Sequence, residues 1–156
     1  MRVLLSIAVG ASVLALTACG GSEPEKASKD SESSTWSMAR SAREFTAIFA
    51  YYDDGISKIR FLDGQETKTS SEYNEACAGF AEVLRENAEK VSTGQWPAEV
   101  KVKMDRFAVS LEEERKEVVD CQNATTMKEV EEALRLRREN SSINAGLALE
   151  KFFAAQ

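Results

Sequence analysis

Apolar residues recur at intervals of three and four positions from Trp36 to the end of the chain, and this spacing constrains the fold more than any other feature. An α-helix with one buried face has this period, whereas a half-buried strand alternates at every second residue. The first run of such positions comprises Phe45, Ile48, Phe49, Tyr52, Ile56 and Ile59. No segment alternates strongly enough to favour a strand, so we expect an all-α domain.

Breaks in this pattern divide the domain into four helices. Residues that form turns or cap helices stand at each break, and they are Asp63-Gly64-Gln65, Thr69 with Glu72, Thr93-Gly94-Gln95, Pro97, and Thr126 with Glu129. The two Thr–Glu pairs have the spacing of capping boxes, glycine suits a helix C-terminus and proline suits a first turn. Gly55 is a weak point within the first helix, where we expect a kink.

Four helices of about 20–28 residues joined by short connections favour an up-down-up-down four-helix bundle over residues 36–156. Each later helix also has an apolar face: Tyr73, Ala76, Phe80, Leu84 and Val91; Val100, Met104, Phe107, Leu111 and Val118; Val130, Leu134, Ser141, Ala145, Ala148 and Phe152. The charge runs Glu112–Glu114 and Arg135–Arg138 are expected on solvated faces.

The N-terminus has the layout of a secretory signal. A positive start, Met1-Arg2, precedes an apolar segment, Val3–Ala15, that is too short for a good membrane-spanning helix. Leu16-Thr17-Ala18-Cys19 then resembles the lipobox of bacterial lipoproteins. The resemblance implies cleavage after residue 18 and attachment of diacylglyceryl, with acyl chains such as palmitate, to Cys19. The alternatives are an ordinary secreted protein and a retained anchor.

Residues 19–35 follow as the lipidated cysteine and a flexible tether. The segment from Gly20 to Thr35 has no large apolar residue and is rich in Gly, Ser, Glu and Lys, so it cannot bury enough surface to offset its ordering entropy. A flexible segment of this length spans roughly 20–25 Å. The chain is therefore expected to be extracytoplasmic and held at the cell membrane by its lipid.

The body has a weaker resemblance of its own. Trp96-Pro97-Ala98-Glu99-Val100, the flanking helices and the preceding cysteine are similar to a group of uncharacterised helical lipoproteins of actinomycetes. The group supplies no established activity.

Composition excludes several kinds of function. The chain has no histidine, which rules out histidine-based catalysis and histidine-ligated metals, and its net charge of −6 argues against a nucleic-acid partner. Asp53-Asp54 and Asp63–Glu66 lack the spacing of a calcium loop, and no catalytic motif appears. We expect no enzymatic activity, no cofactor and no metal.

Cys77 and Cys121 are the two cysteines left if Cys19 is lipidated. An antiparallel arrangement of the second and third helices brings both towards the same end, provided that the loop at residues 121–125 folds back. In an oxidising compartment this predicts a disulfide, with two buried free thiols as the alternative.

Two further groups of residues are candidate sites. Trp36, Trp96, Phe152 and Phe153 are expected at the pole next to the lipid anchor, either as a hydrophobic plug or with tryptophans dipping into the membrane interface. Arg138, Ser141 and Asn144 lie where the apolar stripe of the last helix thins. They form either a solvated or internally satisfied polar layer, or a small polar cavity or partner groove.

These features favour a non-enzymatic interaction module, a rigid bundle at the envelope surface that contacts another protein or a wall polymer. The alternative is a small-ligand carrier or sensor with a pocket between helices, and a hydrolase is a distant third. An exposed apolar patch of several hundred Å² would favour the module, and an enclosed pocket lined by the first and fourth helices would favour the carrier.

Overall fold

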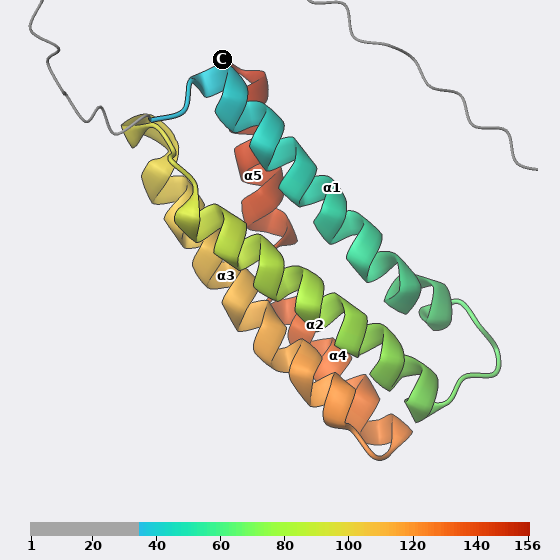
Figure 1. Cartoon of the computed structure of the whole chain (residues 1–156). Helices are drawn as coiled ribbons and strands as arrows, with labels where there is room; N and C mark the ends of the chain where they lie inside the picture. The colour runs from blue at the N-terminus through green and yellow to red at the C-terminus, as the bar shows by residue number, and fades with distance from the viewer. Residues whose placement is uncertain (1–34) are drawn as a thin grey trace, which may run out of the picture. The chain divides into compact units, whose positions relative to one another are not determined.

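The computed structural model describes residues 35–156, and these form five α-helices with no strand among them (Figure 1). The helices are α1 (Met38–Asp63), α2 (Ser70–Thr93), α3 (Ala98–Asn123), α4 (Met127–Glu139) and α5 (Ile143–Ala154). The predicted all-α bundle is confirmed. The predicted signal peptide (1–18), Cys19 and the tether up to residue 34 lie outside the described residues.

The helix ends follow the local signals in the sequence. Both capping boxes form: the Thr69 side chain accepts from the backbone N–H of Glu72, and Thr126 pairs with Glu129 in the same way. α1 ends at Asp63 and α2 at Thr93, one residue before each predicted glycine. Gly94 has a φ of −65°, so its role is not a left-handed cap. The Trp96 indole lies where a Cβ of Gly94 would stand, so that position excludes a side chain.

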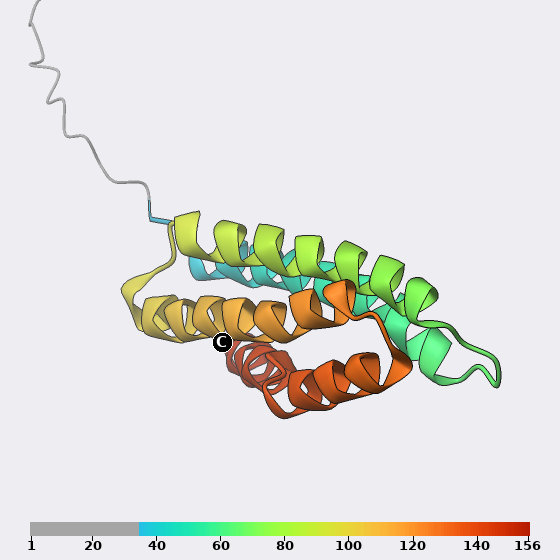
Figure 2. The same cartoon turned by 90° about the horizontal axis from the view of Figure 1, so that it is seen from below.

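The bundle has four antiparallel arms, but the fourth arm consists of two helices. The predicted single fourth helix is wrong, because the chain breaks at Asn140–Ser142, between α4 and α5. α4 packs against α3 and α2, whereas α5 packs against α1 and α3 (Figure 2). The break also changes the buried face. Gly146 and Leu149 are the buried residues of α5, while Ala148 of the predicted stripe is exposed.

Two glycines lie where neighbouring helices pack closely. A Cβ at Gly55 would lie 2.9 Å from Cγ1 of Val83 on α2, and a Cβ at Gly146 would overlap the Phe49 ring of α1. α1 continues through Gly55 as one helix, so the kink expected there is not found. Gly55 lets α1 and α2 pack closely, and Gly146 does the same for α5 and α1.

The core lies along the bundle axis and draws on every arm. Its largest fully buried apolar or aromatic side chains are Tyr52, Tyr73, Phe45, Phe80, Phe107, Ile56, Leu84, Met104 and Leu111. These residues belong to one compact unit that includes all of the described residues, 35–156. Because this unit has its own core, capped helices and disulfide, it can fold on its own. Among the described helices, none combines the length and apolar character needed to cross a membrane.

Candidate functional site

The positions of the candidate residues are described relative to the two ends, or poles, of the bundle. We call the end with Trp36, the 94–97 connection and the end of α5 the near pole, and the end with the 64–69 and 124–126 connections the far pole (Figure 1). A hydrogen bond of 2.7 Å from the Trp36 backbone N–H to the Gln95 carbonyl ties the start of the described chain to the near pole.

A disulfide joins Cys77 of α2 to Cys121 of α3, with 6.0 Å between the Cα atoms, and lies towards the far pole. The predicted pairing is confirmed, but the fold-back expected at residues 121–125 is wrong because Cys121 is within α3. Gly94 and Pro97 have extended backbone, and α3 begins beyond the end of α2 (Figure 2). Because α3 starts farther along the bundle axis than α2 ends, Cys121 of α3 lies level with Cys77 of α2.

The four predicted aromatic residues form two pairs at the near pole. The ring centroids of Trp36 and Trp96 are 4.7 Å apart, and those of Phe152 and Phe153 are 5.6 Å apart. Trp96 is only 4% exposed and its Nε1–H donates to the Val91 carbonyl at 2.6 Å. This burial fits a hydrophobic plug, with Trp36 half-buried at its edge. Proximity to a membrane stays a prediction.

A buried carboxylate is the centre of a polar cluster inside the bundle. Glu114 of α3 is fully buried and accepts the Tyr52 hydroxyl at 3.0 and 3.1 Å. It also accepts the backbone N–H of Ser142 at 2.9 Å and the Ser142 hydroxyl at 2.7 Å. Ser142 is the N-cap of α5 and makes no side-chain cap of its own. Glu114 therefore caps α5 from another helix, where a negative charge suits the helix N-terminus.

Neighbours complete this cluster. Nε of Arg137 lies 3.7 Å from Oε1 of Glu114, and the Ser141 hydroxyl lies 3.2 Å from the Tyr52 hydroxyl. Burial, together with the negative charge of Glu114, raises the pKa of Tyr52 to about 12. The cluster is closed by its own side chains, because the hydroxyls and the carboxylate satisfy one another.

This cluster revises two expectations. Glu114 was expected on a solvated face with Glu112 and Glu113, yet it is buried because it continues the apolar stripe of α3, three residues after Leu111. Of the three predicted polar residues, Ser141 joins the cluster, whereas Arg138 and Asn144 are exposed. Arg137 of α4 and Ser142 at the start of α5 point inwards instead. The hydroxyls and the carboxylate satisfy one another, whereas Nε of Arg137 is buried 3.7 Å from Glu114 without a hydrogen bond.

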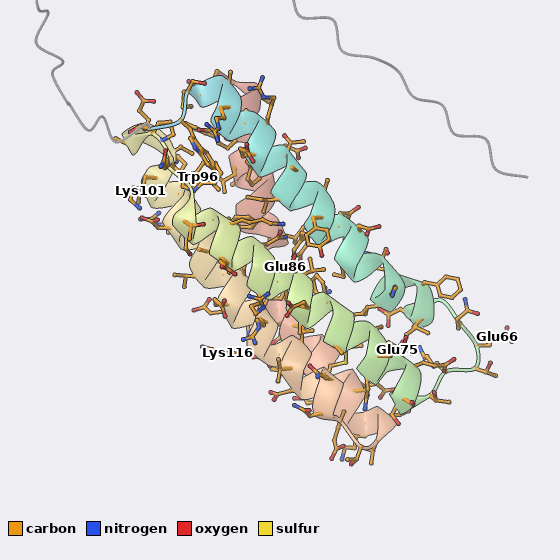
Figure 3. All side chains as sticks on the ribbon, in the orientation of Figure 1. Glu66, Glu75, Glu86, Trp96, Lys101 and Lys116 are labelled. Carbon is orange, nitrogen blue, oxygen red and sulfur yellow. A yellow bond between two sulfur atoms is a disulfide. The ribbon has the colours of Figure 1, made fainter. Side chains whose placement is uncertain are left out.

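An apolar groove at the far pole lies between the end of α1 and the start of α2. It has a volume of about 630 Å³ and is lined by Ser57, Lys58, Phe61, Leu62, Glu72, Glu75 and Ala76. Phe61 is 67% exposed, more than any other large apolar side chain among the described residues. Figure 3 shows Glu75 on α2, close to the 64–69 connection. The predicted candidate sites did not include this groove, although Phe61 is an apolar residue off the buried stripe of α1.

A second hollow is lined mainly by charged and polar side chains. This hollow of about 1070 Å³ lies between the end of α3 and α4, where Arg135 pairs with Glu132 and Glu139 and where Glu129 caps α4. Arg135, Glu132 and Glu129 are therefore engaged by their neighbours. Within residues 35–156, no three His, Cys, Asp or Glu side chains gather in a way that could hold a metal.

Comparison of the chain with protein families, with curated proteins and with solved structures finds no match. The site must therefore be interpreted from its own chemistry.

Proposed function

We propose that this chain is a lipoprotein of the bacterial cell envelope whose helical bundle is a non-enzymatic interaction module. Cys19 is the proposed lipid attachment site, and residues 20–35 are the proposed tether. The disulfide between Cys77 and Cys121 supports an extracytoplasmic location, because such bonds persist in oxidising compartments.

The groove at the far pole carries this proposal. It combines an apolar floor with an exposed Phe61 and lies at the pole opposite the start of the described chain. Exposed apolar surface costs free energy in water, so a partner that covers Phe61 would gain from its burial. A tether at the near pole would leave this groove directed away from the membrane, where another envelope protein or a wall polymer could reach it.

The alternative, a small-ligand carrier, has less support. The hollow between α1, α2 and α4 has a volume of about 180 Å³ and is lined in part by Asp63, Tyr73, Leu134 and Arg138. Ligand pockets are usually enclosed and about 300–1,000 Å³, whereas the far-pole groove, which has this volume, is open to solvent. The Glu114 cluster is filled by its own side chains, so the described interior has little space for a ligand.

Cys19→Ala tests the anchoring. We expect the wild-type chain in its native host to incorporate labelled fatty acid and to fractionate with membranes, and the variant to lose the label. A variant that still incorporates the label would show that Cys19 is not the acceptor. A wild-type chain without any label would contradict the lipoprotein proposal.

Crosslinking in the intact envelope tests the interaction. A photoreactive residue at position 61 should capture a macromolecule, whereas the same residue at position 102 should not. Val102 of α3 is a matched control because it is 60% exposed and does not line the groove. Equal capture at both positions, or none at position 61, would contradict a docking role for the groove.

A further inference from the structure

The walls of the far-pole groove carry opposite charges that lack partners within the bundle. Lys58 lies on the α1 wall and Glu75 on the α2 wall, and both are exposed. In the part of the chain that the structure describes, neither forms an ion pair. The remaining acid of the groove, Glu72, is engaged by Thr69 in the capping box. The groove therefore offers one free cation, one free anion and an exposed phenylalanine.

The two free charges lie at the same height along the bundle. Lys58 and Glu75 face each other across one groove, although α1 and α2 run in opposite directions. A two-fold axis parallel to the bundle would set this face against its own copy without changing any height. α1 of one copy would then oppose α2 of the other. Lys58 of each copy would therefore meet Glu75 of the other copy, which gives two equivalent ion pairs. Phe61 would meet its own symmetry mate near the axis.

The other face-to-face arrangement is disfavoured by the same charges. A two-fold axis perpendicular to the helices at this level would set α1 against α1 and α2 against α2. Lys58 would then approach a second Lys58 and Glu75 a second Glu75, and like charges that meet at an interface are repelled.

Gly79, one turn beyond Glu75, has no side chain that would obstruct the approach of a second copy.

We propose that the α1–α2 face around Phe61 is a homodimer interface in which two copies of this chain pack in parallel about a two-fold axis. Isologous interfaces need a surface that is complementary to itself, and an apolar centre flanked by one cation and one anion has this property. The inference narrows the proposed docking partner of the groove to a second copy of this chain, in place of a different envelope protein or a wall polymer, and in that respect rests on the proposed function. A parallel pair also keeps both near poles on one side, as two anchors in one membrane would require.

Sedimentation equilibrium of residues 20–156, produced with the disulfide formed, tests the dimer. This segment contains the whole described unit, residues 35–156, and does not depend on the lipid. We expect the average mass to rise from monomer towards dimer between about 1 µM and 1 mM, as for a small transient interface. A mass that stays monomeric throughout this range would overturn the proposal.

Charge exchange tests the parallel arrangement. Lys58→Glu and Glu75→Lys should each weaken dimerisation by about tenfold, because each removes two pairs and sets like charges against each other. The double variant should return to within about twofold of the wild type, since the pairs re-form with their signs exchanged. A double variant as weak as the single variants would overturn the proposed arrangement.

Matched variants outside the groove exclude general effects. Lys116→Glu on α3 makes the same change in net charge as Lys58→Glu, and Lys116 does not line the groove (Figure 3). Phe61→Ser should weaken the dimer, whereas Val102→Ser should not. A dimer insensitive to both Lys58→Glu and Phe61→Ser would have its interface elsewhere and would refute the proposal. Failure of lipid labelling in the full chain would contradict the anchoring while leaving this measurement unaffected.

Discussion

At the scale of single residues, burial converts an ordinary acidic side chain into a structural centre. Glu114 has two acidic neighbours in sequence, yet it alone is buried, with Tyr52 and Ser142 donating to it. A charge is costly to bury unless hydrogen bonds and an opposite charge replace the water it loses. Here the hydroxyls, the start of α5 and Arg137 supply that replacement.

Glu114→Ala is expected to lower the free energy of unfolding by about 3 kcal/mol or more, because it leaves the Ser142 N–H buried without an acceptor and the largely buried Arg137 without its opposite charge. Chemical denaturation measures this. Glu113→Ala is the matched control, since Glu113 is exposed, and should change stability by less than about 0.5 kcal/mol. Equal effects of the two variants would contradict the role of Glu114.

The titration of Tyr52 should appear in the dependence of stability on pH. Because burial and Glu114 raise its pKa to about 12, the folded state holds the proton more tightly than the unfolded state, whose tyrosine titrates near pH 10. The resulting stabilisation is complete below about pH 10 and is lost as the pH rises towards 12. Absorbance of tyrosinate at alkaline pH, compared between wild type and Tyr52→Phe, isolates this group. If the difference in tyrosinate absorbance between the two proteins had its titration midpoint near pH 10, the raised pKa of Tyr52 would be contradicted.

At the scale of elements, helix ends depend on local chemistry. Which face of α5 is buried depends instead on contacts with helices that are distant in the sequence. The capping boxes at Thr69 and Thr126 begin α2 and α4 as predicted. The run Asn140-Ser141-Ser142 consists of residues that favour caps over helix interiors, so the sequence contained a signal for the break. Glu114 stabilises the break by capping α5. Beyond the break, Gly146 and Leu149 are the residues of α5 that face the core.

Two helical glycines should respond in opposite ways to the same substitution. Gly146→Ala should lower stability by about 1–3 kcal/mol, because its methyl group would overlap Phe49, whose ring is stacked between Phe45 and Tyr52. Gly79→Ala should raise stability by about 0.5–1 kcal/mol, since a Cβ there meets nothing within 4 Å and alanine favours the helix. Thermal and urea unfolding at low micromolar concentration test both. The same sign for both substitutions would contradict the packing of α5 on α1.

At the scale of the whole molecule, α2 and α3 are the covalently joined pair, and the outer arms are held by packing. The disulfide between Cys77 and Cys121 closes a loop across 44 positions that includes the 94–97 connection. α1 and α5 complete the bundle through the close approaches at Gly55 and Gly146. The near pole is closed by aromatic side chains, and the far pole presents the groove.

Removal of the disulfide should therefore weaken the entire unit. Cys77→Ser with Cys121→Ser is expected to lower the free energy of unfolding by roughly 3–4 kcal/mol, because the unfolded chain gains the freedom of an open loop. Denaturant titrations of the double variant and of the reduced wild type should agree, and thiol counting of the unreduced unfolded unit should find none at these positions. Two titratable thiols in the wild type would contradict the bond.

The sequence by itself determined the all-α class, the number of arms, most helix ends and the pairing of Cys77 with Cys121. The class, the arms and the helix ends depend on the period of apolar residues and on capping contacts a few positions apart, so local spacing is sufficient for them. The cysteine pairing followed instead from the antiparallel order of the second and third helices and from the number of cysteines left if Cys19 is lipidated. The burial of Glu114, the division of the fourth arm and the groove beside Phe61 were decided only by the tertiary structure. Each depends on which side chains meet between helices far apart in the chain, where burial and close packing, rather than local spacing, set the free energy.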